Sequence, residues 1–300
     1  MPRLRRSELS TPGSNERMIE RAAESDADLV FLDLEDACAP SEKVPARAKV
    51  VHGLKTLDWG RKTRAIRINN LESEWCYQDI IQVVEEAGEF LDVIIVPKVK
   101  RAEDVRWVDV LLTQIEQRLR RPRRIGLEVL IEEVEAMINA EEIARATPRL
   151  EALIFGPGDY SASQGITVDQ IGGSNVDYPA DIWHYARNKV IIAARAAGIE
   201  AIDGPFADFQ DTEGYRTQCK RAQILGCTGK WAIHPGQIKV ANELFSPTQQ
   251  QVERARKLIA GYAKAEQEGL GAVAIDGVMV DAASARLMRN TTAKADLIGM

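Results

Sequence analysis

Cysteine is scarce in this sequence of 300 residues, and long apolar runs are absent from it. The four cysteines, Cys38, Cys76, Cys219 and Cys227, are scattered without a Cys-x-x-Cys pair, which favours a reducing cytoplasm. The longest apolar runs span only a handful of residues, whereas a membrane helix needs roughly 20. No apolar segment of the secretory type follows the N-terminus, and no lipid-anchor motif is apparent. We therefore expect a cytoplasmic protein with no membrane partner.

An excess of positive charge is also lacking. Lys and Arg number 39 against 45 Asp and Glu, which gives a net charge of -6 and an isoelectric point near 5.4. This balance argues against a general nucleic-acid-binding protein, and the local basic cluster from Arg118 to Arg124 is interpreted as a solvated helix end. With 45% apolar and 28% charged residues, the chain is expected to be globular, with one large core or two modest ones.

Short β-branched runs alternate with longer helical patterns along most of the chain. The eight predicted strands are Leu4–Leu9, Asp28–Leu34, Arg64–Ile68, Asp92–Val96, Ile125–Ile131, Ala152–Phe155, Ile199–Ile202 and Gly229–Ile233. The predicted helices between them are Ser14–Glu24, Glu42–Leu57, Trp75–Ala87, Ala102–Arg121, Glu133–Ala146, Ala180–Ala197 and Asp211–Leu225. Eight strands in alternation with helices are typical of a (β/α)8 barrel. An open doubly wound sheet remains an alternative, because the first strand carries three charges and the last is short.

The pattern changes after His234. One helix runs to about Leu244, Ser246-Pro247 breaks the chain, and a charged helix follows to about Gln267. Gly269–Gly271 then precedes a last apolar segment that ends at Asp281. We interpret residues 1–244 as the catalytic barrel and residues 245–300 as an appended C-terminal domain. Glycines on both sides of a short apolar stretch suit a mobile lid that excludes water from a site.

Two acidic residues each close an apolar run. Glu132 follows the run from Ile125 to Ile131, and Asp159 follows the run from Ala152 to Gly158. An ionised carboxylate at the emerging end of a buried strand is costly unless a cation meets it, and a hard divalent cation can do so. Arg67 closes a third run and offers a planar donor fork to a carboxylate or a developing oxyanion. Together the three residues indicate a metal-assisted active site that handles anions.

Further polar or turn-forming segments follow the other predicted strands. They are Pro12–Asn15, Asp33–Asp36, Pro97-Lys98, Asp203–Phe206 and His234-Pro235. Barrel enzymes place their chemistry at the carboxyl ends of the strands, so this coincidence favours an enzyme. Each segment also has a simpler interpretation. Lys98 could merely pair with the acidic cluster, and His234 could cap a helix.

The acidic cluster itself, Asp33, Glu35 and Asp36, allows two interpretations. It could be a charge cluster at a helix N-terminus or a partner for Lys43 and Arg47, or it could position the residues that hold the metal. The segment Gly156–Gly158 lacks the spacing of a dinucleotide or Walker loop, although its backbone N–H groups could bind a carboxylate. Glu132 and Asp159, taken singly, could be ordinary ion-pair partners. Only their combination with Arg67 favours a metal site.

Several longer motifs resemble a known family. They are Arg6-Ser-Glu-Leu with Pro12-Gly-Ser, Phe31-Leu-Asp-Leu-Glu-Asp-Ala37, Arg67-Ile-Asn69, Ile95-Val-Pro-Lys98, Leu130-Ile-Glu132, Phe155-Gly-Pro-Gly-Asp159, Ile202-Asp-Gly-Pro-Phe-Ala-Asp-Phe209, Gly229-Lys-Trp-Ala-Ile-His-Pro235 and Met279-Val-Asp281. Over nearly the whole chain these motifs resemble the citrate lyase β-subunit and HpcH/HpaI aldolase superfamily. The last three point to its L-malyl-CoA/β-methylmalyl-CoA lyase branch.

The resemblance implies a (β/α)8 barrel that holds Mg²⁺, with Mn²⁺ as the alternative, on Glu132 and Asp159. It implies that Arg67 stabilises the substrate oxyanion and that Asp281, on the C-terminal flap, is a catalytic base in a neighbouring subunit's site. A homo-oligomer, a trimer or a hexamer, would follow. The implied substrate contacts are Ser10, Asn15, Arg21, Arg67, Gly158, Asp159, Ile233 and His234.

The implied reaction is the reversible cleavage of malyl-CoA or β-methylmalyl-CoA to acetyl-CoA or propionyl-CoA and glyoxylate. Alternatives on the same scaffold are a malyl-CoA or citramalyl-CoA thioesterase, a citramalyl-CoA lyase and a CoA-independent 2-oxoacid aldolase. A non-enzymatic acyl-CoA-binding assembly subunit is the alternative outside catalysis. The presence of Arg67, Glu132, Asp159 and Asp281 together argues against it.

Overall fold

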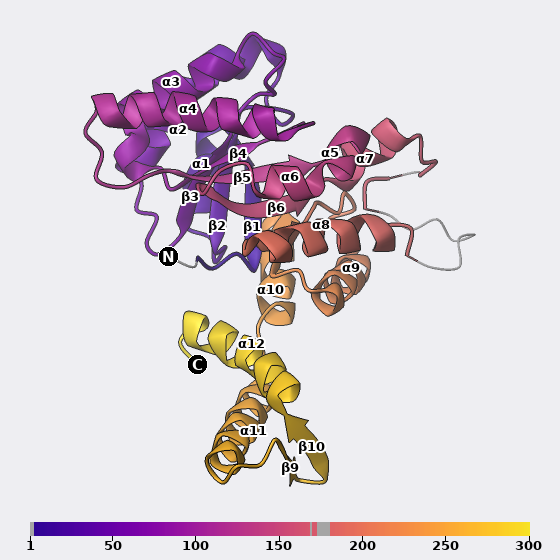
Figure 1. Ribbon diagram of the computed structural model, residues 1–300. Coiled ribbons are helices and arrows are strands. Elements are labelled where there is room, and N and C mark those ends of the chain that lie inside the picture. Colours follow the sequence, from indigo (N-terminus) through magenta and orange to yellow (C-terminus); the bar gives the residue numbers. More distant parts are fainter. Residues whose placement is uncertain (1–2, 169, 173–180) are drawn as a thin grey trace. The chain divides into compact units, whose positions relative to one another are not determined.

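The structure is a computed structural model that describes residues 3–168, 170–172 and 181–300 (Figure 1). It contains two compact units. The larger unit is Arg5–Glu243, and the smaller is Leu244–Met300 with Arg3 and Leu4.

The larger unit is a closed barrel whose eight strands follow one another in sequence order. The strands are β1 (Ser7–Pro12), β2 (Leu29–Asp33), β3 (Thr63–Arg67), β4 (Val93–Val96), β5 (Gly126–Ile131), β6 (Leu150–Phe155), β7 (Glu200–Asp203) and β8 (Gly229–Ala232). Every neighbouring pair is parallel, and β8 pairs with β1 to close the ring. The predicted (β/α)8 barrel is therefore confirmed, and the open doubly wound sheet is wrong.

Helices cover the outside of the strands, as Figure 1 shows for α2 to α4 on one side and α8 and α9 on another. They are α1 (Glu16–Ala23), α2 (Lys43–Thr56), α3 (Cys76–Ala87), α4 (Ala102–Arg118), α5 (Val134–Ile138), α6 (Ala140–Ala144), α7 (Pro157–Gln164), α8 (His184–Ala197), α9 (Thr212–Leu225) and α10 (Pro235–Leu244). Two short 3-10 turns, η1 (Pro40–Glu42) and η2 (Gly88–Phe90), precede α2 and β4.

Four predicted boundaries need correction. The first strand is Ser7–Pro12 rather than Leu4–Leu9, because its pairing with β2 runs from Glu8 to Pro12. The single helix expected over Glu133–Ala146 is two short helices, α5 and α6, which Asn139 separates. The amide of Asn139 donates to the Lys100 carbonyl, a tertiary contact that the local pattern did not contain. The helix expected over Ala102–Arg121 ends at Arg118, and Arg120 has a positive φ of 52°.

The fourth correction concerns the helix predicted over Ala180–Ala197. It begins at His184, and its predicted first residue, Ala180, lies outside the described residues.

The barrel core is formed by side chains on the inward faces of its strands. Ten buried residues make up this cluster: Leu29, Phe31, Ala65, Val93, Ile95, Leu130, Ala152, Ile154, Ile202 and Trp231. Their spacing of two along each strand follows from the alternation of side chains across a sheet. The same alternation carries Asp33, Arg67 and Glu132 to the inward face one step further along their strands. The core therefore underlies the candidate site.

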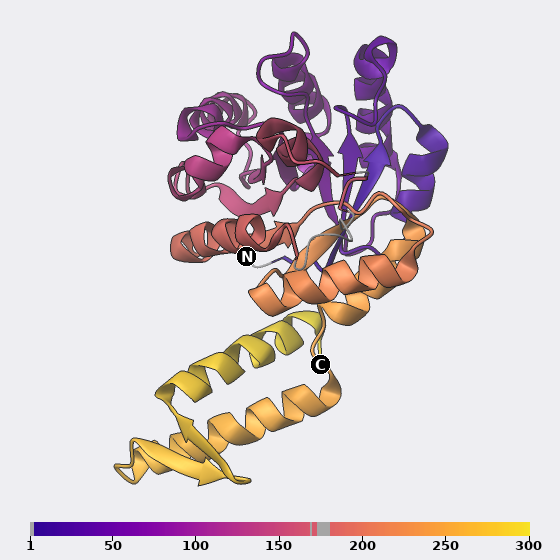
Figure 2. The same ribbon diagram turned by 90° about the vertical axis from the view of Figure 1, so that its right-hand side faces the viewer.

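The smaller unit consists of two helices and a hairpin. Helix α11 (Gln249–Gln267) begins with a capping box in which Thr248 and Gln251 bond each other's backbone N–H. Strands β9 (Ala272–Ile275) and β10 (Val278–Asp281) form an antiparallel hairpin, and α12 (Ala282–Ile298) lies beside α11 (Figure 2). Its apolar cluster is small and centres on Leu258, Tyr262, Val280 and Ala285. The prediction of α11 is confirmed, whereas α12 was not predicted.

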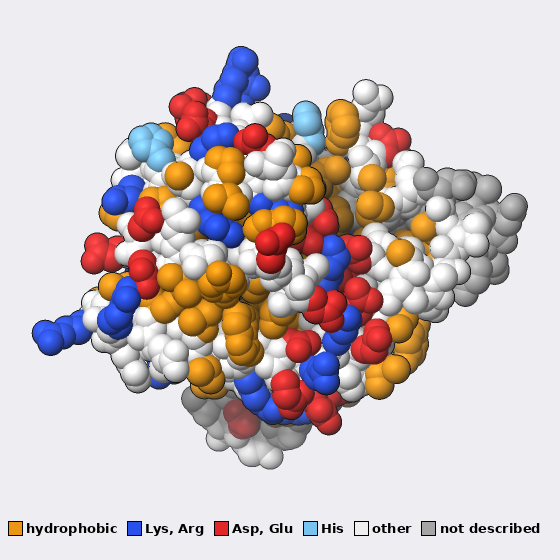
Figure 3. Space-filling view, turned by 90° about the horizontal axis from the view of Figure 1, so that it is seen from above, with side chains coloured by type: hydrophobic (Ala, Val, Ile, Leu, Met, Phe, Trp, Pro, Cys, Tyr) orange, Lys and Arg blue, Asp and Glu red, His pale blue; other side chains and the backbone are white. Residues whose placement is uncertain are grey.

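Among the described residues, no helix is both long and apolar enough to cross a bilayer. On the face drawn in Figure 3, acidic and basic side chains are interspersed with apolar ones.

Candidate active site at the carboxyl ends of the strands

Arg67 is fixed by its neighbour on β2. The parallel register sets Asp33 beside Arg67 at the carboxyl ends of β2 and β3. Arg67 donates from Nε to Asp33 Oδ1 at 2.8 Å and from Nη2 to Oδ2 at 2.5 Å, a bidentate pair. Burial lowers the pKa of Arg67, but the surrounding carboxylates, Asp33 first among them, outweigh burial and raise it above the ordinary value. The guanidinium is therefore a permanent cation held in one orientation.

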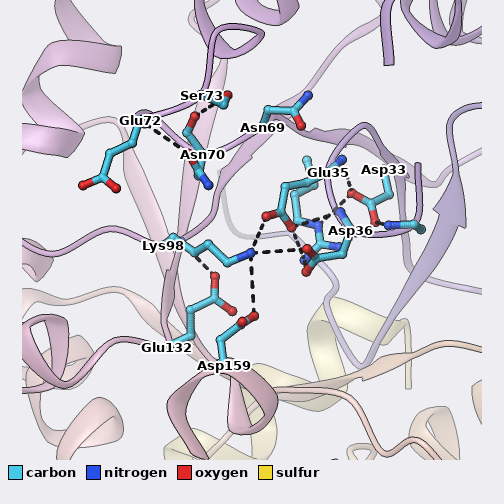
Figure 4. Close-up of polar contacts among 12 residues, drawn as sticks. Asp33, Glu35, Asp36, Asn69, Asn70, Glu72, Ser73, Lys98, Glu132 and Asp159 are labelled. Carbon is cyan, nitrogen blue, oxygen red and sulfur yellow. Dashed lines mark hydrogen bonds and ion pairs between the residues drawn. The ribbon is translucent and has the colours of Figure 1, made fainter. Parts of the chain in front are cut away.

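A second cation, Lys98, lies between the acidic loop after β2 and the carboxylates that follow β5 and β6 (Figure 4). Its Nζ is 2.5 Å from Glu35, 3.3 Å from Asp36 and 4.0 Å from Asp159. Its backbone N–H donates to Glu132 Oε1 at 2.8 Å. Lys98 is one of the few non-glycine residues described with a positive φ, 50°. The prediction that Lys98 pairs with the acidic cluster is confirmed.

Glu132 is a buried carboxyl, only 2% exposed. The Lys98 N–H bonds one oxygen, and a Cβ placed on Gly156 would lie 2.6 Å from the other oxygen, so the side chain fills the space that the glycine leaves. Burial, and then the charge of Asp159, raise the pKa of Glu132 to about 8. The ionised form of Glu132 would therefore gain from a further cation at this point.

Asp159 supplies the second carboxylate of the pair. It lies in the first turn of α7, which starts with Pro157 directly after Gly156. Its side chain is 41% exposed, so it can be reached from solvent. In Figure 4 the carboxylates of Glu132 and Asp159 point toward the same space beside Lys98. The two carboxylates therefore lie on the same side of the site, and their role as metal ligands stays a prediction.

The donor set fits a hard divalent cation. In the part of the chain that the structure describes, no group of three or more His, Cys, Asp or Glu is arranged to hold an ion. Mg²⁺ does not need such a group, because it commonly takes one or two carboxylates and keeps several waters or substrate oxygens. A buried acid with a raised pKa next to a solvent-accessible one meets that requirement. Glu132 and Asp159 are therefore the residues that would hold the ion.

The acidic side chains of this loop pair with Arg67 and Lys98 rather than with the basic side chains of α2. Lys43 Nζ donates to the carbonyls of Leu34 and Glu35 and to Asn69 Oδ1, while Arg47 Nε donates to Asp79. The acidic side chains instead surround Arg67 and Lys98. Arg67 Nη1 lies 3.3 Å from Glu35 and 3.5 Å from Asp36. Burial raises the pKa of Glu35 to about 7, although Arg67 opposes the shift.

Three candidate substrate residues lie at the start of the barrel. Ser10 is on the same face of β1 as the buried Glu8 and is partly exposed. Asn15 caps α1, where its side chain accepts from the Met18 N–H at 3.1 Å. Arg21 lies in the last turn of α1 and is exposed.

The other candidate substrate residues follow β6 and β8. Gly158 precedes Asp159 in the first turn of α7, and a Cβ there would meet the side chain of Ile171 at 3.1 Å. Ile233 is 36% exposed, and its N–H donates to Gln237. His234 Nδ1 accepts from the Gly236 N–H at 3.1 Å, which confirms its capping role, and its ring stacks on Phe209.

Asp281 belongs to the smaller unit, where it caps α12. Its Oδ1 accepts from the backbone N–H and the hydroxyl of Ser284, each at 2.8 Å. These bonds, the backbone one first, lower the pKa of the exposed Asp281.

Two residues near Arg67 were not predicted from the sequence. Glu8 and Trp231 lie inside the barrel, and the Trp231 Nε1–H donates to Glu8 at 2.9 Å. The sequence did contain a signal, because a carboxylate at an inward position of a strand is unusual. Glu8 lies within the predicted strand Leu4–Leu9, but the charged pattern of that strand does not show which of its faces points into the barrel.

Comparisons with known proteins identify the family of this chain. The family model described as HpcH/HpaI aldolase/citrate lyase matches residues 6–235. An L-malyl-CoA/beta-methylmalyl-CoA lyase of Rhodobacter capsulatus is 43% identical over 293 residues, which cover 95% of this chain and 92% of the relative. A (3S)-malyl-CoA thioesterase of Cereibacter sphaeroides is 35% identical over 293 residues, which cover 98% and 95%.

A solved structure, CitE from Mycobacterium tuberculosis in complex with magnesium, acetoacetate and coenzyme A, has a TM-score of 0.76 to this chain. It is 26% identical and covers 97% of both chains. The match of the family model to most of the chain, together with the 43% identity to a relative of almost equal length, shows that this protein belongs to the HpcH/HpaI aldolase/citrate lyase family.

Proposed function

We propose that this protein is a magnesium-dependent lyase that reversibly cleaves malyl-CoA or β-methylmalyl-CoA to acetyl-CoA or propionyl-CoA and glyoxylate. One observation supports the proposal: the buried Glu132 and the accessible Asp159 lie at Lys98, on the side opposite Glu35 and Asp36, where they could hold a divalent cation. Cleavage creates negative charge that needs stabilisation, and this site offers cationic groups for it.

Two groups of the site, Arg67 and the proposed divalent ion, would stabilise different oxygens during the reaction. Cleavage removes the hydroxyl proton, breaks the carbon–carbon bond and leaves its electron pair on the thioester as an enolate, which a proton then converts to the acyl-CoA product. We assign the enolate oxygen to Arg67, whose orientation Asp33 fixes before substrate arrives. A divalent ion on Glu132 and Asp159 would supply Lewis-acid stabilisation at the glyoxylate oxygens.

Asp281 is our candidate for the base that removes the methyl proton in the condensing direction. Its low pKa in the exposed state makes it a weak base, so it would need to lose solvent on closure. We propose that residues 245–300 act as a lid that carries Asp281 to a neighbouring subunit's site, and that the protein is a homo-oligomer, a trimer or a hexamer. Substrate contacts are proposed for Ser10, Asn15, Arg21, Gly158, Ile233 and His234.

A cytoplasmic location is proposed as well, because all four cysteines are free and buried thiols. Mg²⁺ is the proposed ion, and Mn²⁺ is the alternative, because both accept carboxylate and water ligands.

The second candidate function is a malyl-CoA or citramalyl-CoA thioesterase. The observation in its favour is the 35% identity to a (3S)-malyl-CoA thioesterase over nearly the whole chain. A thioesterase would break the thioester with water and leave the carbon–carbon bond intact.

Product analysis separates the two functions. The full-length protein would be incubated with Mg²⁺ and malyl-CoA, and the products identified by mass spectrometry. We expect acetyl-CoA with glyoxylate, whereas free CoA with malate would establish the thioesterase and refute the lyase.

Asp159→Ala should lose about 100-fold or more in turnover, because a carboxylate ligand is removed. Undiminished Mg²⁺-dependent turnover in that variant would refute the ligand assignment. The exposed Glu142→Ala, on α6, serves as the matched control.

A further inference from the structure

An aromatic ring lies beneath the guanidinium of Arg67. Trp231, on β8, is 3% exposed inside the barrel, and the Arg67 Cζ is 5.5 Å from the centroid of its ring. Phe31 packs against the same ring, with centroids 4.4 Å apart. A guanidinium over an indole face is attracted to the negative face of the ring. Arg67 is therefore held both by the Asp33 carboxylate and by the indole.

The indole is fixed in turn by a buried carboxyl group. The Trp231 Nε1–H donates to Glu8 Oε2 at 2.9 Å, and the register of β1 and β8 sets Glu8 beside Trp231. Glu8 is fully buried. Because an indole has a single donor, this bond determines which way the ring faces.

Glu8 is held from across the barrel by a second carboxyl group. The carboxyl group of Glu8 interacts with that of Glu128 on β5, and Arg5 Nε donates to Glu128 Oε1 at 2.7 Å. Burial, and then the charge of Glu128, raise the pKa of Glu8 well above its ordinary value. The pair can share the barrel interior because one member keeps its proton while Arg5 neutralises the other. In this state Glu8 has the shape and hydrogen-bonding capacity of a glutamine.

We propose that Trp231 and Glu8 are positioning residues for the reaction: Glu8 orients the indole, and the indole sets the place of the Arg67 guanidinium. The inference rests on the proposed function, because it takes Arg67 as the group that meets the enolate oxygen. Neither residue is assigned a contact with the substrate.

The test measures malyl-CoA cleavage by full-length variants with saturating Mg²⁺. Trp231→Leu should lower kcat about 100-fold, the usual effect of a misplaced catalytic group, with KM and Mg²⁺ affinity little changed. Glu8→Leu should lower kcat about tenfold, because it frees the indole without removing it. Glu8→Gln should keep kcat within about twofold, because the amide accepts from Trp231 and donates to Glu128.

A matched pair separates positioning from general stability. Trp59 is 4% exposed, and its Nε1–H donates to the Gly53 carbonyl at 3.1 Å, outside the barrel interior. Trp59→Phe and Trp231→Phe each lose one buried indole hydrogen bond, so both should lower the melting temperature. Only Trp231→Phe should lower kcat, and it is the milder variant if Trp231→Leu does not fold.

The outcomes also separate this inference from the proposed function. Wild-type protein that yields no glyoxylate refutes the lyase. An active wild type whose Trp231→Leu and Glu8→Leu variants keep its kcat overturns the inference alone, as does equal loss in Glu8→Gln and Glu8→Leu. A crystal structure of Glu8→Leu tests the inference without an assay. Displacement of the indole and the guanidinium is expected, and unchanged positions for both would overturn it.

Discussion

At the scale of single residues, the site is organised by the balance between carboxylates and cations. Asp33, Glu35 and Asp36 surround Arg67 and Lys98, so most of the acidic groups already have a cationic partner. Glu132 differs, because it is buried and its pKa is raised to about 8. Because ionised Glu132 is costly without a further cation, we expect a divalent ion at Glu132 and Asp159.

The same scale gives a prediction for pH. Glu8 has a raised pKa in the folded state, so between its ordinary value and the raised one the folded chain binds a proton that the unfolded chain has released. The free energy of unfolding should therefore fall as pH rises through this window. Glu8→Gln removes this proton linkage, so its stability relative to wild type should increase with pH, by at most about 1.4 kcal/mol per unit.

Urea denaturation at pH 5.5 and pH 8 measures this difference. The exposed Glu20→Gln, on α1, is the control for exchanging a carboxyl group for an amide away from the barrel interior. A constant difference between Glu8→Gln and wild type would mean that Glu8 is ionised in the fold.

At the scale of elements, the carboxyl ends of the strands bring the site residues together. The junction of β6 and α7 determines how closely the backbone approaches Glu132. Gly156 caps α7 at the point where the chain passes Glu132. A methyl group there would lie 2.6 Å from both Cβ and Oε2 of Glu132, closer than any real contact. Gly156→Ala must therefore displace Glu132, and we expect Mg²⁺ affinity to fall at least about tenfold while the barrel stays folded.

Isothermal titration with Mg²⁺ measures this loss, and circular dichroism measures the fold. Gly158→Ala is the matched control, because its methyl group would meet only the Ile171 side chain at 3.1 Å. Its Mg²⁺ affinity should stay near that of wild type. Normal affinity in Gly156→Ala would show that Glu132 is not a ligand.

The elements also show how much could be predicted from the sequence. Eight apolar runs with polar residues at their ends were enough to predict the barrel and to bring Glu132, Asp159 and Arg67 together. The local pattern could not show that Asn139 would break a helix for a contact with Lys100, or that the first strand would begin at Ser7. Contacts at the seam where β1 meets β8, such as that between Glu8 and Trp231, depend on register and closure, which periodicity alone does not fix.

At the scale of the whole molecule, the chain has two compact units with very different cores. The barrel has a large buried interior, whereas the smaller unit is built around a cluster of four buried residues with three partly buried ones packed against it. Several of its apolar side chains are exposed, Met279 and Leu287 by more than half. Such a unit is suited to gain stability from a further partner, in line with the proposed lid on a neighbouring subunit.

Mixing two inactive variants tests whether the site is shared between subunits. Arg67→Lys alters the barrel and Asp281→Asn alters the lid, and each alone should be nearly inactive. If the lid closes over a neighbour, hybrid oligomers contain some sites with both native residues. For random one-to-one assembly, about a quarter of the sites should be active.

Co-expression of the two variants, followed by a turnover assay, measures this recovery. A mixture of Arg67→Lys and Glu132→Gln should recover nothing, because both changes fall on the barrel. Failure of the Arg67→Lys and Asp281→Asn mixture to recover activity would place the lid over its own barrel.

The left-handed backbone at Lys98 has a consequence for protein engineering. An L-residue in this conformation costs roughly 1 kcal/mol of folding free energy compared with glycine. The conformation lets one residue aim its amide at Glu132 and its ammonium at Glu35. Replacing this strained residue with glycine to gain stability would remove the Lys98 ammonium. Among the described residues, that side chain is what joins Glu35 to the residue bonded to Glu132. A gain in folding stability at this position would then come with a loss of turnover.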